Sequence, residues 1–165
     1  MVFRLAAAII DDVPIVLSLI KALADYEQLA DQVKATEADL RAALFGPRPA
    51  AEVIIGYADH EPAGFALYFQ SFSTFVGRPG LYLEDLFVKP EWRKHGLGRQ
   101  LLARLAHIAV ERGYGRMEWS VLNWNEMAIR VYRAAGARPL SDWTVYRLTG
   151  DELNALADQD ARAVR

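Results

Sequence analysis

The sequence has no cysteine, no long apolar run and almost no excess of charge. Without cysteine there can be no disulfide, no cysteine nucleophile and no thiolate metal site, and the chain is compatible with a reducing compartment. No stretch approaches the ~20 apolar residues of a membrane span, and the apolar N-terminus runs into Asp11 and Asp12 without a signal-peptide cleavage pattern. We therefore expect a cytoplasmic protein that does not enter a membrane.

The net charge and the positions of the histidines argue against two further kinds of partner, nucleic acids and metal ions. With 19 basic and 21 acidic residues, the formal net charge is −2, so the broad basic field of a nucleic-acid-binding protein is missing. The three histidines, His60, His95 and His107, are scattered, and no pair has metal-ligand spacing beside acidic residues. We expect no nucleic-acid partner, no metal and no Ser-His-Asp arrangement.

What the chain does contain is enough apolar material for one core. Its 165 residues, 53% hydrophobic and 24% charged, are typical of a single globular domain. We expect one domain over residues 1–158, followed by a flexible tail at 159–165.

The pattern of apolar and turn residues predicts alternating strands and helices. Strands are expected at 3–9, 52–58, 64–72, 81–88, 116–122 and 143–148, and helices from Asp11 or Asp12, from the Thr36–Asp39 capping box, and at 97–112, 125–135 and 151–157. Short turns join the second, third and fourth strands, which favours an antiparallel meander. The later strand–helix–strand order favours a parallel crossover, so we predict a mixed α/β fold.

A glycine-containing turn precedes the long helix expected at 97–112. Its sequence is Arg93-Lys94-His95-Gly96-Leu97-Gly98, followed by Arg99. Glycine permits a close backbone approach, and the start of the helix supplies unpaired N–H groups and a positive dipole end, which together suit a pyrophosphate. The turn lacks the third glycine of a dinucleotide fingerprint and the Gly-Lys-Ser/Thr of a P-loop. An ordinary loop before a helix is the alternative interpretation.

This turn resembles the Arg/Gln-x-x-Gly-x-Gly/Ala acetyl-CoA motif of the GNAT superfamily. Flanking segments extend the resemblance to the spermidine/spermine (diamine) acetyltransferase branch, from Arg4 to about Leu148; they are 64–69, 81–88, 124–126, Tyr132 and Gly136-Ala137. The resemblance implies a GNAT-like fold, antiparallel in its N-terminal half and β-α-β in its C-terminal half, around a splayed central strand. It also implies acetyl-CoA as acyl donor, transfer to an amine by direct attack, and a homodimer.

The resemblance assigns roles to particular residues. It implies that Glu84 accepts the amine proton, that Asp85 helps to bind the cationic substrate, and that Tyr132 protonates the departing thiolate. The expected cofactor-binding residues are Leu86, Phe87, Val88, Arg93, Lys94, His95, Gly96, Leu97, Gly98, Arg99, Asn125, Ala128 and Tyr132.

Structural alternatives exist for each of these side chains. Glu84 and Asp85 are adjacent on a strand, so at most one is expected to face a given cleft, and both could instead be solvated or salt-bridged. Tyr132 lies two helical turns after Asn125, where a core aromatic residue is the alternative.

The acceptor is expected to be a small primary amine. Tyr26 and Glu27 resemble the pair that lines the amine site of the diamine branch. The Ser-Phe-Ser-Thr-Phe loop at 71–75 lacks the Asp and Trp of the polyamine enzymes and looks more like the thialysine-acetylating relatives. We expect a diamine or an amino acid with a lysine-like side chain. A protein N-terminus, an aminoglycoside, a non-catalytic acyl-CoA sensor and a nucleotide-binding module are the alternatives.

Overall fold

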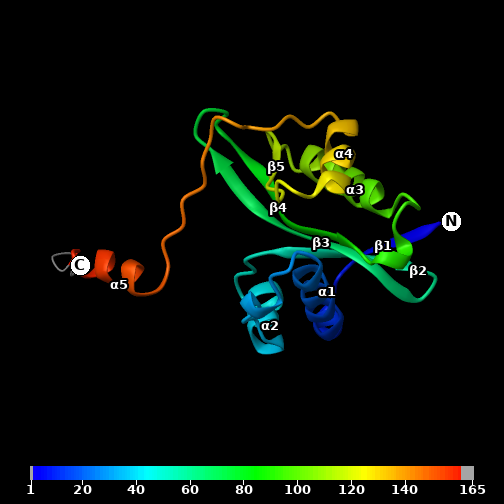
Figure 1. Cartoon of the computed structure of the whole chain (residues 1–165), viewed down its shortest axis with the longest axis horizontal. Coiled ribbons are helices and arrows are strands. Elements are labelled where there is room, and N and C mark those ends of the chain that lie inside the picture. The colour runs from blue at the N-terminus through cyan, green and yellow to red at the C-terminus, as the bar shows by residue number, and fades with distance from the viewer. Residues whose placement is uncertain (1, 161–165) are drawn as a thin grey trace.

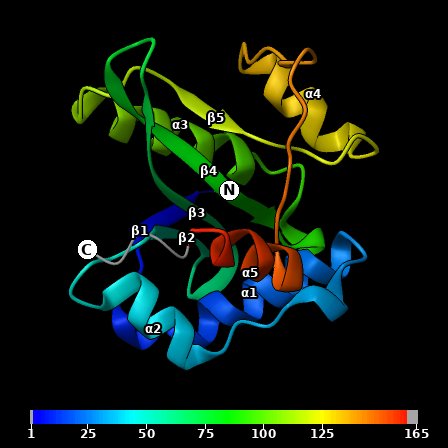
Figure 2. The same ribbon diagram turned by 90° about the vertical axis from the view of Figure 1, so that its left-hand side faces the viewer.

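The structure, a computed structural model, describes residues 2–160. Within them, the strands form one five-stranded sheet in the order β1 (Phe3–Ala7), β2 (Glu52–Ala58), β3 (Glu61–Ser73), β4 (Arg78–Val88) and β5 (Met117–Trp119). Helices α1 (Val13–Tyr26) and α2 (Glu37–Phe45) cover one face, and α3 (Leu97–Glu111) and α4 (Glu126–Ala134) cover the other (Figures 1 and 2). The mixed α/β fold predicted from the sequence is confirmed.

The strand directions also follow the prediction. β1 to β4 pair antiparallel with their neighbours, whereas β5 pairs parallel with β4, with α3 as the crossover between them. Short 3-10 turns lie at Ile10–Asp12, Ala30–Gln32 and Pro90–Trp92. The long antiparallel part makes a stiff platform, and the single parallel pair places the start of α3 beside the end of β4.

Apolar side chains fill both faces of the sheet. Below it, Val13, Val16 and Leu19 of α1 pack around Ile55 and Phe65. Above it, the α3 leucines at 97, 101, 102 and 105 pack on Leu81 and Leu83. Each fully buried Leu or Phe contributes about 1.5–3 kcal/mol relative to an exposed one, so α1 and α3 are held firmly against the platform.

Two helix starts carry the caps that the sequence predicts. The Thr36 N–H donates to Asp39 Oδ2 at 2.8 Å, and the Asp39 N–H donates to Thr36 Oγ1 at 3.2 Å, which closes the capping box of α2. The Ala128 N–H donates to Asn125 Oδ1 at 3.2 Å and fixes the start of α4.

Two irregularities separate β4 from its neighbours. Leu67 of β3 lies opposite Asp85, but Tyr68 lies opposite Leu83, so Glu84 is an extra residue that forms a β-bulge in β4. On the other side, the pairing of β4 with β5 covers only Leu81–Leu83. Beyond this point the two strands part, and the main chain of β4 from residue 84 onward faces the gap.

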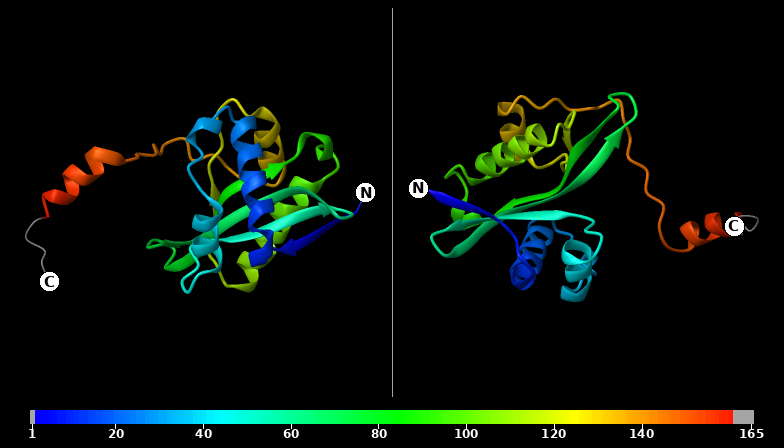
Figure 3. Two further views of the ribbon diagram at one scale, coloured as in Figure 1. Left: turned by 90° about the horizontal axis from the view of Figure 1, so that it is seen from below. Right: turned by 180° about the vertical axis from the view of Figure 1, so that it is seen from behind.

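The strand predicted at 143–148 is not formed. After α4, residues 138–149 make an extended segment, called here the C-terminal arm, that leads to α5 (Gly150–Asp158), which lies apart from the sheet in both views of Figure 3. Every residue from Arg138 to Asp160 is exposed. The apolar alternation at 143–148 has high strand propensity, but a strand forms only against a partner edge, and the arm leads away from the sheet.

The remaining boundaries differ modestly from the predictions. β5 covers three of the seven residues expected at 116–122, because β4 and β5 part after Trp119. The end of the predicted tail, residues 161–165, lies outside the described residues. Over the described chain, none of the helices combines the length and the apolar character that crossing a membrane requires.

Candidate active site

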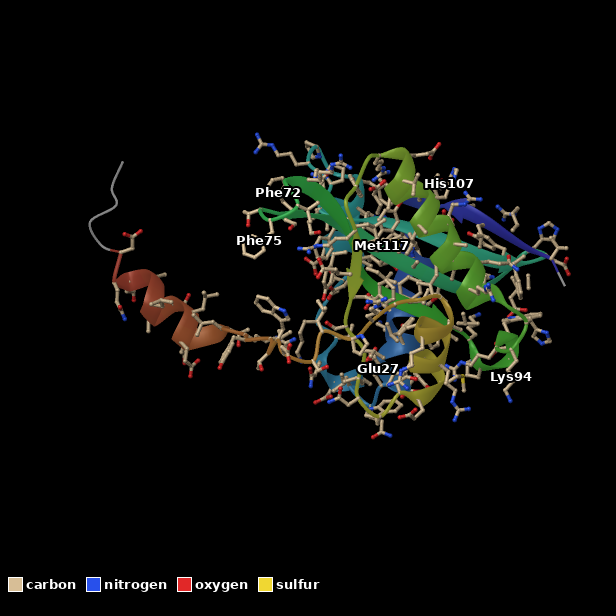
Figure 4. The ribbon with its side chains drawn as sticks, turned by 90° about the horizontal axis from the view of Figure 1, so that it is seen from above. Glu27, Phe72, Phe75, Lys94, His107 and Met117 are labelled. Atoms are coloured by element: carbon tan, nitrogen blue, oxygen red, sulfur yellow. The ribbon has the colours of Figure 1, made fainter. Side chains whose placement is uncertain are left out.

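A cavity of about 760 Å³ opens where β4 and β5 part. It is bounded by the end of α1, the end of β4, the turn before α3, the residues after β5, and α4. Figure 4 labels Glu27 and Lys94, which come from the first and the third of these elements. Segments from both halves of the sequence therefore contribute to one site.

The turn before α3 presents unpaired amides to this cavity. Across the described residues 2–160, the main-chain N–H groups of 94–99 donate no hydrogen bond, whereas the next one, Gln100, donates to the Gly96 carbonyl at 3.0 Å. Lys94 and Gly96 have positive φ angles of 65° and 90°, a backbone alternation that points successive N–H groups to one side. With the helix dipole behind them, these donors fit a pyrophosphate, as the sequence predicts.

The basic residues of the turn have different environments. Arg93 donates from Nε to the Val88 carbonyl at 2.9 Å, and its guanidinium carbon lies 4.2 Å from the centroid of the Tyr26 ring. Arg93 is thus held between β4 and α1. Lys94 and Arg99 are exposed at the wall of the cavity, while His95 is exposed and is not part of its lining.

Three acidic residues also belong to the lining of the cavity: Glu27, Glu84 and Asp85. Glu84 is the bulge residue, and a bulge interrupts the alternation of a regular strand, so both members of the adjacent pair can contribute to one lining. Burial, followed by the negative charges of Glu84 and Glu27, raises the pKa of Asp85 to about 6. Burial also raises the pKa of Glu27, whereas Glu84 itself is exposed.

Asn125, Ala128 and Tyr132 line the cavity from one face of α4. The Tyr132 ring packs edge-on against Trp119, with ring centroids 5.2 Å apart. Burial, followed by the charge of Glu27, raises the pKa of Tyr132 to about 12, so its hydroxyl keeps its proton throughout the neutral range. Tyr132 is therefore a packing residue of the cavity lining whose hydroxyl is protonated at neutral pH.

The main chain of β4 supplies the remaining predicted residues. Leu86, Phe87 and Val88 line the cavity, and the described residues place no strand beside their free edge because β5 has already ended. Apart from His95, every predicted cofactor-binding residue lies in the lining, as do Tyr26 and Glu27 from α1.

Several lining residues were not predicted. They are Leu23, Leu29, Trp92, Ser120, Val121, Leu122, Met127, Val131 and Arg147. Ser120–Leu122 could have been found from their position, because they follow directly on the carboxyl end of a strand parallel to β4, where ligand sites in α/β sheets gather. Leu23 and Met127 look like ordinary core positions in the sequence, and nothing in it signals Arg147. Among residues 2–160, no three His, Cys, Asp or Glu side chains are grouped so that they could hold a metal ion.

Comparisons with known proteins agree with this geometry. The profile of the Acetyltransferase (GNAT) family matches residues 18–137. A thialysine N-epsilon-acetyltransferase from Bos taurus is 39% identical over 86% of this chain and 89% of its own length. An L-ornithine N5-acetyltransferase from Arabidopsis thaliana is 30% identical over 93% of this chain and 87% of its own. A solved structure of an integron cassette protein from V. cholerae has a TM-score of 0.76 and 28% identity, over 95% of this chain and 98% of that one.

Fold, site and similarity together define an acyl-transfer enzyme. The chain belongs to the GNAT acetyltransferase family and is an N-acetyltransferase. Enzymes of this family use acetyl-CoA, and the unpaired amides at 94–99 are the groups of this chain that would hold its pyrophosphate.

Proposed function

We propose that this enzyme acetylates the primary amine of a small molecule, a diamine or an amino acid with a lysine-like side chain, by direct attack within a ternary complex. The observation that carries the proposal is the joining of two opposite charge environments in one cavity. The lining combines an amide turn suited to a diphosphate with Glu27, Glu84 and Asp85, which are suited to an alkylammonium.

The acidic residues would have two roles toward the acceptor amine: accepting its proton and binding its cationic end. An alkylammonium has no lone pair and must lose a proton before it can attack. Asp85, with a pKa of about 6, is ionised at neutral pH and close enough to neutrality to accept a proton, directly or through water. The exposed Glu84 and the partly buried Glu27 would hold the cationic end. The raised pKa of Asp85 supports this residue as the proton acceptor, and we propose that Glu84, the acceptor that the resemblance implies, binds the amine or relays the proton instead.

Tyr132 would complete the proton balance. When bound, acetyl-CoA supplies a thioester, and the sulfur that leaves needs a proton. The Tyr132 hydroxyl, kept protonated by its raised pKa, lines the same cavity and can deliver that proton. The burial that makes the phenol a weaker acid also raises the pKa of a thiol in the same cavity, so the difference between the two governs the transfer.

The names of the similar enzymes support the acceptor class. Thialysine and ornithine both carry a terminal primary amine on a flexible chain, and neither is a long polycation. The 71–75 segment, where the resemblance to polyamine enzymes weakens, does not contribute to the cavity. We also propose that the enzyme acts in the cytoplasm, since a chain without cysteine suits a reducing compartment, and that it assembles as a homodimer.

A panel of amines with release of free CoA as the readout tests this function. We expect turnover with thialysine and ornithine, less with spermidine, and none above background with an aminoglycoside or a peptide N-terminus. Glu27→Gln should raise KM for the amine by ~10-fold through loss of a charge-assisted contact. Asp25→Asn, which changes an exposed residue of α1 outside the cavity, is the control. Binding of acetyl-CoA without turnover of any amine would instead indicate a sensor.

A further inference from the structure

An arginine stacked on aromatic rings joins the end of α1 to the turn before α3. The guanidinium carbon of Arg93 lies 4.2 Å from the centroid of the Tyr26 ring and 5.7 Å from that of the Phe87 ring. Both are cation–π distances, and the partial burial of Arg93 and Tyr26 strengthens such a contact relative to one in open water. Arg93 belongs to the turn, Tyr26 is the last residue of α1, and Phe87 lies in β4. The stack therefore links three elements that line the cavity.

The two members of the stack are also fixed by other neighbours. The Arg93 Nε donates to the Val88 carbonyl at 2.9 Å, which ties the guanidinium to the main chain of β4. The Tyr26 ring packs edge-on against Trp124, with ring centroids 5.7 Å apart. Among residues 2–160, no carboxylate forms an ion pair with Arg93, so its charge is available to an anion in the cavity. One guanidinium can thus contact a diphosphate and the Tyr26 ring together.

Glu27 follows directly on Tyr26, in the turn that closes α1. The Leu29 N–H donates to the Ala24 carbonyl at 2.8 Å across this turn, and Gln28 has a positive φ of 61°. This left-handed conformation ends many helices, but it is strained in a residue other than glycine and persists only where surrounding contacts hold it. The stacked Tyr26 ring supplies such a contact. The placement of Glu27 therefore depends on the stack.

Glu27 forms no ion pair with the basic residues of the turn in the part of the chain that the structure describes, and Figure 4 shows it apart from Lys94. A diphosphate bound at the turn would therefore influence Glu27 through Tyr26, the adjacent residue that contacts the turn.

We propose that Arg93 is a positioning residue that couples the binding of acetyl-CoA to the binding of the amine. A diphosphate that fixes the guanidinium also fixes the Tyr26 ring, and with it the closing turn that carries Glu27. Each ligand then strengthens the binding of the other, because the first already orders the side chains that the second needs. The inference rests on the proposed function, in which residues 94–99 hold the diphosphate and Glu27 holds the amine.

Calorimetric titration with ornithine, with and without saturating CoA, measures the coupling. CoA carries no acetyl group, so no reaction occurs during the titration. In the wild-type protein, CoA should lower the Kd of ornithine by ~10-fold. Tyr26→Leu, which removes the ring, should reduce this factor to ~2 or less, and Tyr26→Phe, which keeps a ring for Arg93, should retain it. A wild-type factor of one, or an unchanged factor in Tyr26→Leu, would overturn the proposal.

Arg93→Gln and Lys94→Gln form a matched pair, because each removes one positive charge from the turn. Both should weaken CoA binding. At saturating CoA, only Arg93→Gln should also lose the coupling, since Lys94 is exposed and is not among the cations stacked on aromatic rings within residues 2–160. Equal coupling in the two variants would mean that Arg93 acts on the diphosphate alone, and would refute its positioning role.

Hydrogen exchange needs no amine, so it separates a failure of this inference from a failure of the proposed function. Saturating CoA should slow exchange of the amides at 27–29 at least ~5-fold in the wild-type protein and in Lys94→Gln, but not in Arg93→Gln. Slowing that persists in Arg93→Gln would mean that CoA covers this turn directly, and would overturn the inference. If neither ornithine nor thialysine binds but the slowing requires Arg93, the link from the turn to α1 stands and the proposed acceptor is wrong.

Discussion

Two side chains of the cavity differ in acidity from their counterparts in water, and both differences follow from burial beside carboxylates. Asp85 and Tyr132 hold their protons more tightly, with pKa values of about 6 and about 12. One group is therefore ready to accept a proton at neutral pH, and the other is fully protonated and able to give one. Buried groups with such shifted pKa values suit acid–base catalysis, which is why we propose these two residues for it.

Replacing Tyr132 by Phe should lower kcat by ~10-fold or more while KM for acetyl-CoA stays nearly constant. The ring that packs on Trp119 is kept, so the loss isolates the hydroxyl. Steady-state kinetics with saturating amine provide the measurement. Tyr114→Phe, which removes a hydroxyl that donates to Gln70 outside the cavity, is the control. Unchanged turnover in Tyr132→Phe would exclude this residue from the chemistry.

Asp85→Asn should remove the acidic limb of the kcat/KM profile, which we expect near pH 6. Below this pH the wild-type carboxyl is protonated and cannot take the amine proton. Glu84→Gln should lower activity but keep the limb, because Asp85 remains. If the limb persists in Asp85→Asn and disappears in Glu84→Gln, the proton goes to Glu84 instead.

Asp85→Asn should also stabilise the fold at alkaline pH. An Asp in the unfolded chain has a pKa of ~3.9, so Asp85 binds its proton more tightly when folded. Its contribution to stability is present at low pH and is lost as pH rises through about 6. At pH 8, Asp85→Asn should therefore raise the free energy of unfolding by about 2–3 kcal/mol, and by much less at pH 4. Urea denaturation measures this, with the exposed Asp158→Asn as control.

At the scale of elements, the site depends on how α3 begins. Gly96 precedes the helix with a φ of 90°, and Gly113 follows it with a φ of 70°. A Cβ at Gly113 would meet nothing within 4 Å, and one at Gly96 would meet only the Gln100 amide at 4.0 Å. Substitution by alanine at either position thus costs backbone strain alone, ~1–2 kcal/mol.

Because Gly96 and Gly113 are similar in backbone conformation and surroundings, one can serve as the control for the other. Gly96→Ala and Gly113→Ala should lower the free energy of unfolding by similar amounts, but only Gly96→Ala should weaken CoA binding, by ~10-fold or more, because it reorients the amides that face the diphosphate. Urea denaturation and calorimetric titration with CoA give the two readouts. Equal losses of CoA affinity in both variants would mean that the turn has no specific role.

The elements that the sequence predicts well are those stabilised by local contacts. The capping box at Thr36, the cap at Asn125 and the amphipathic α1 and α3 each have a signal within a few residues. Residues 143–148 have an equally strong strand pattern, yet they remain extended and exposed because pairing requires an edge that local sequence does not provide.

The candidate site likewise has some features with a local sequence signal and others that depend on the tertiary fold. The glycines of the turn, and the presence of Glu84, Asp85 and Tyr132 at one cavity, could be anticipated from a motif and its context, whereas the roles of these three residues stay predictions. The resemblance implies a bulge that splays the central strand, but the position of that bulge at Glu84 is visible only in the pairing of β3 with β4, and on a regular strand the two carboxylates would be expected on opposite faces. Which of them is buried enough to hold a proton near neutrality depends on that geometry.

At the scale of the whole molecule, the proposed homodimer would make stability depend on protein concentration. When folding is coupled to association, Tm rises with protein concentration by mass action. We therefore expect Tm to rise over a 100-fold concentration range, measured by calorimetry. A Tm that is independent of concentration over this range, together with a monomeric mass in sedimentation experiments, would contradict the proposed homodimer.

The central claim is that the amides at residues 94–99 bind the diphosphate of CoA, and thermal unfolding with and without ligands tests it most directly. At a ligand concentration ~100 times Kd, binding to the folded state adds ~2.7 kcal/mol to the free energy of unfolding. We predict a saturable rise in Tm with acetyl-CoA and with CoA, and none with ATP or NAD. Unfolding that is insensitive to acetyl-CoA and CoA, or stabilisation by ATP or NAD alone, would contradict the account.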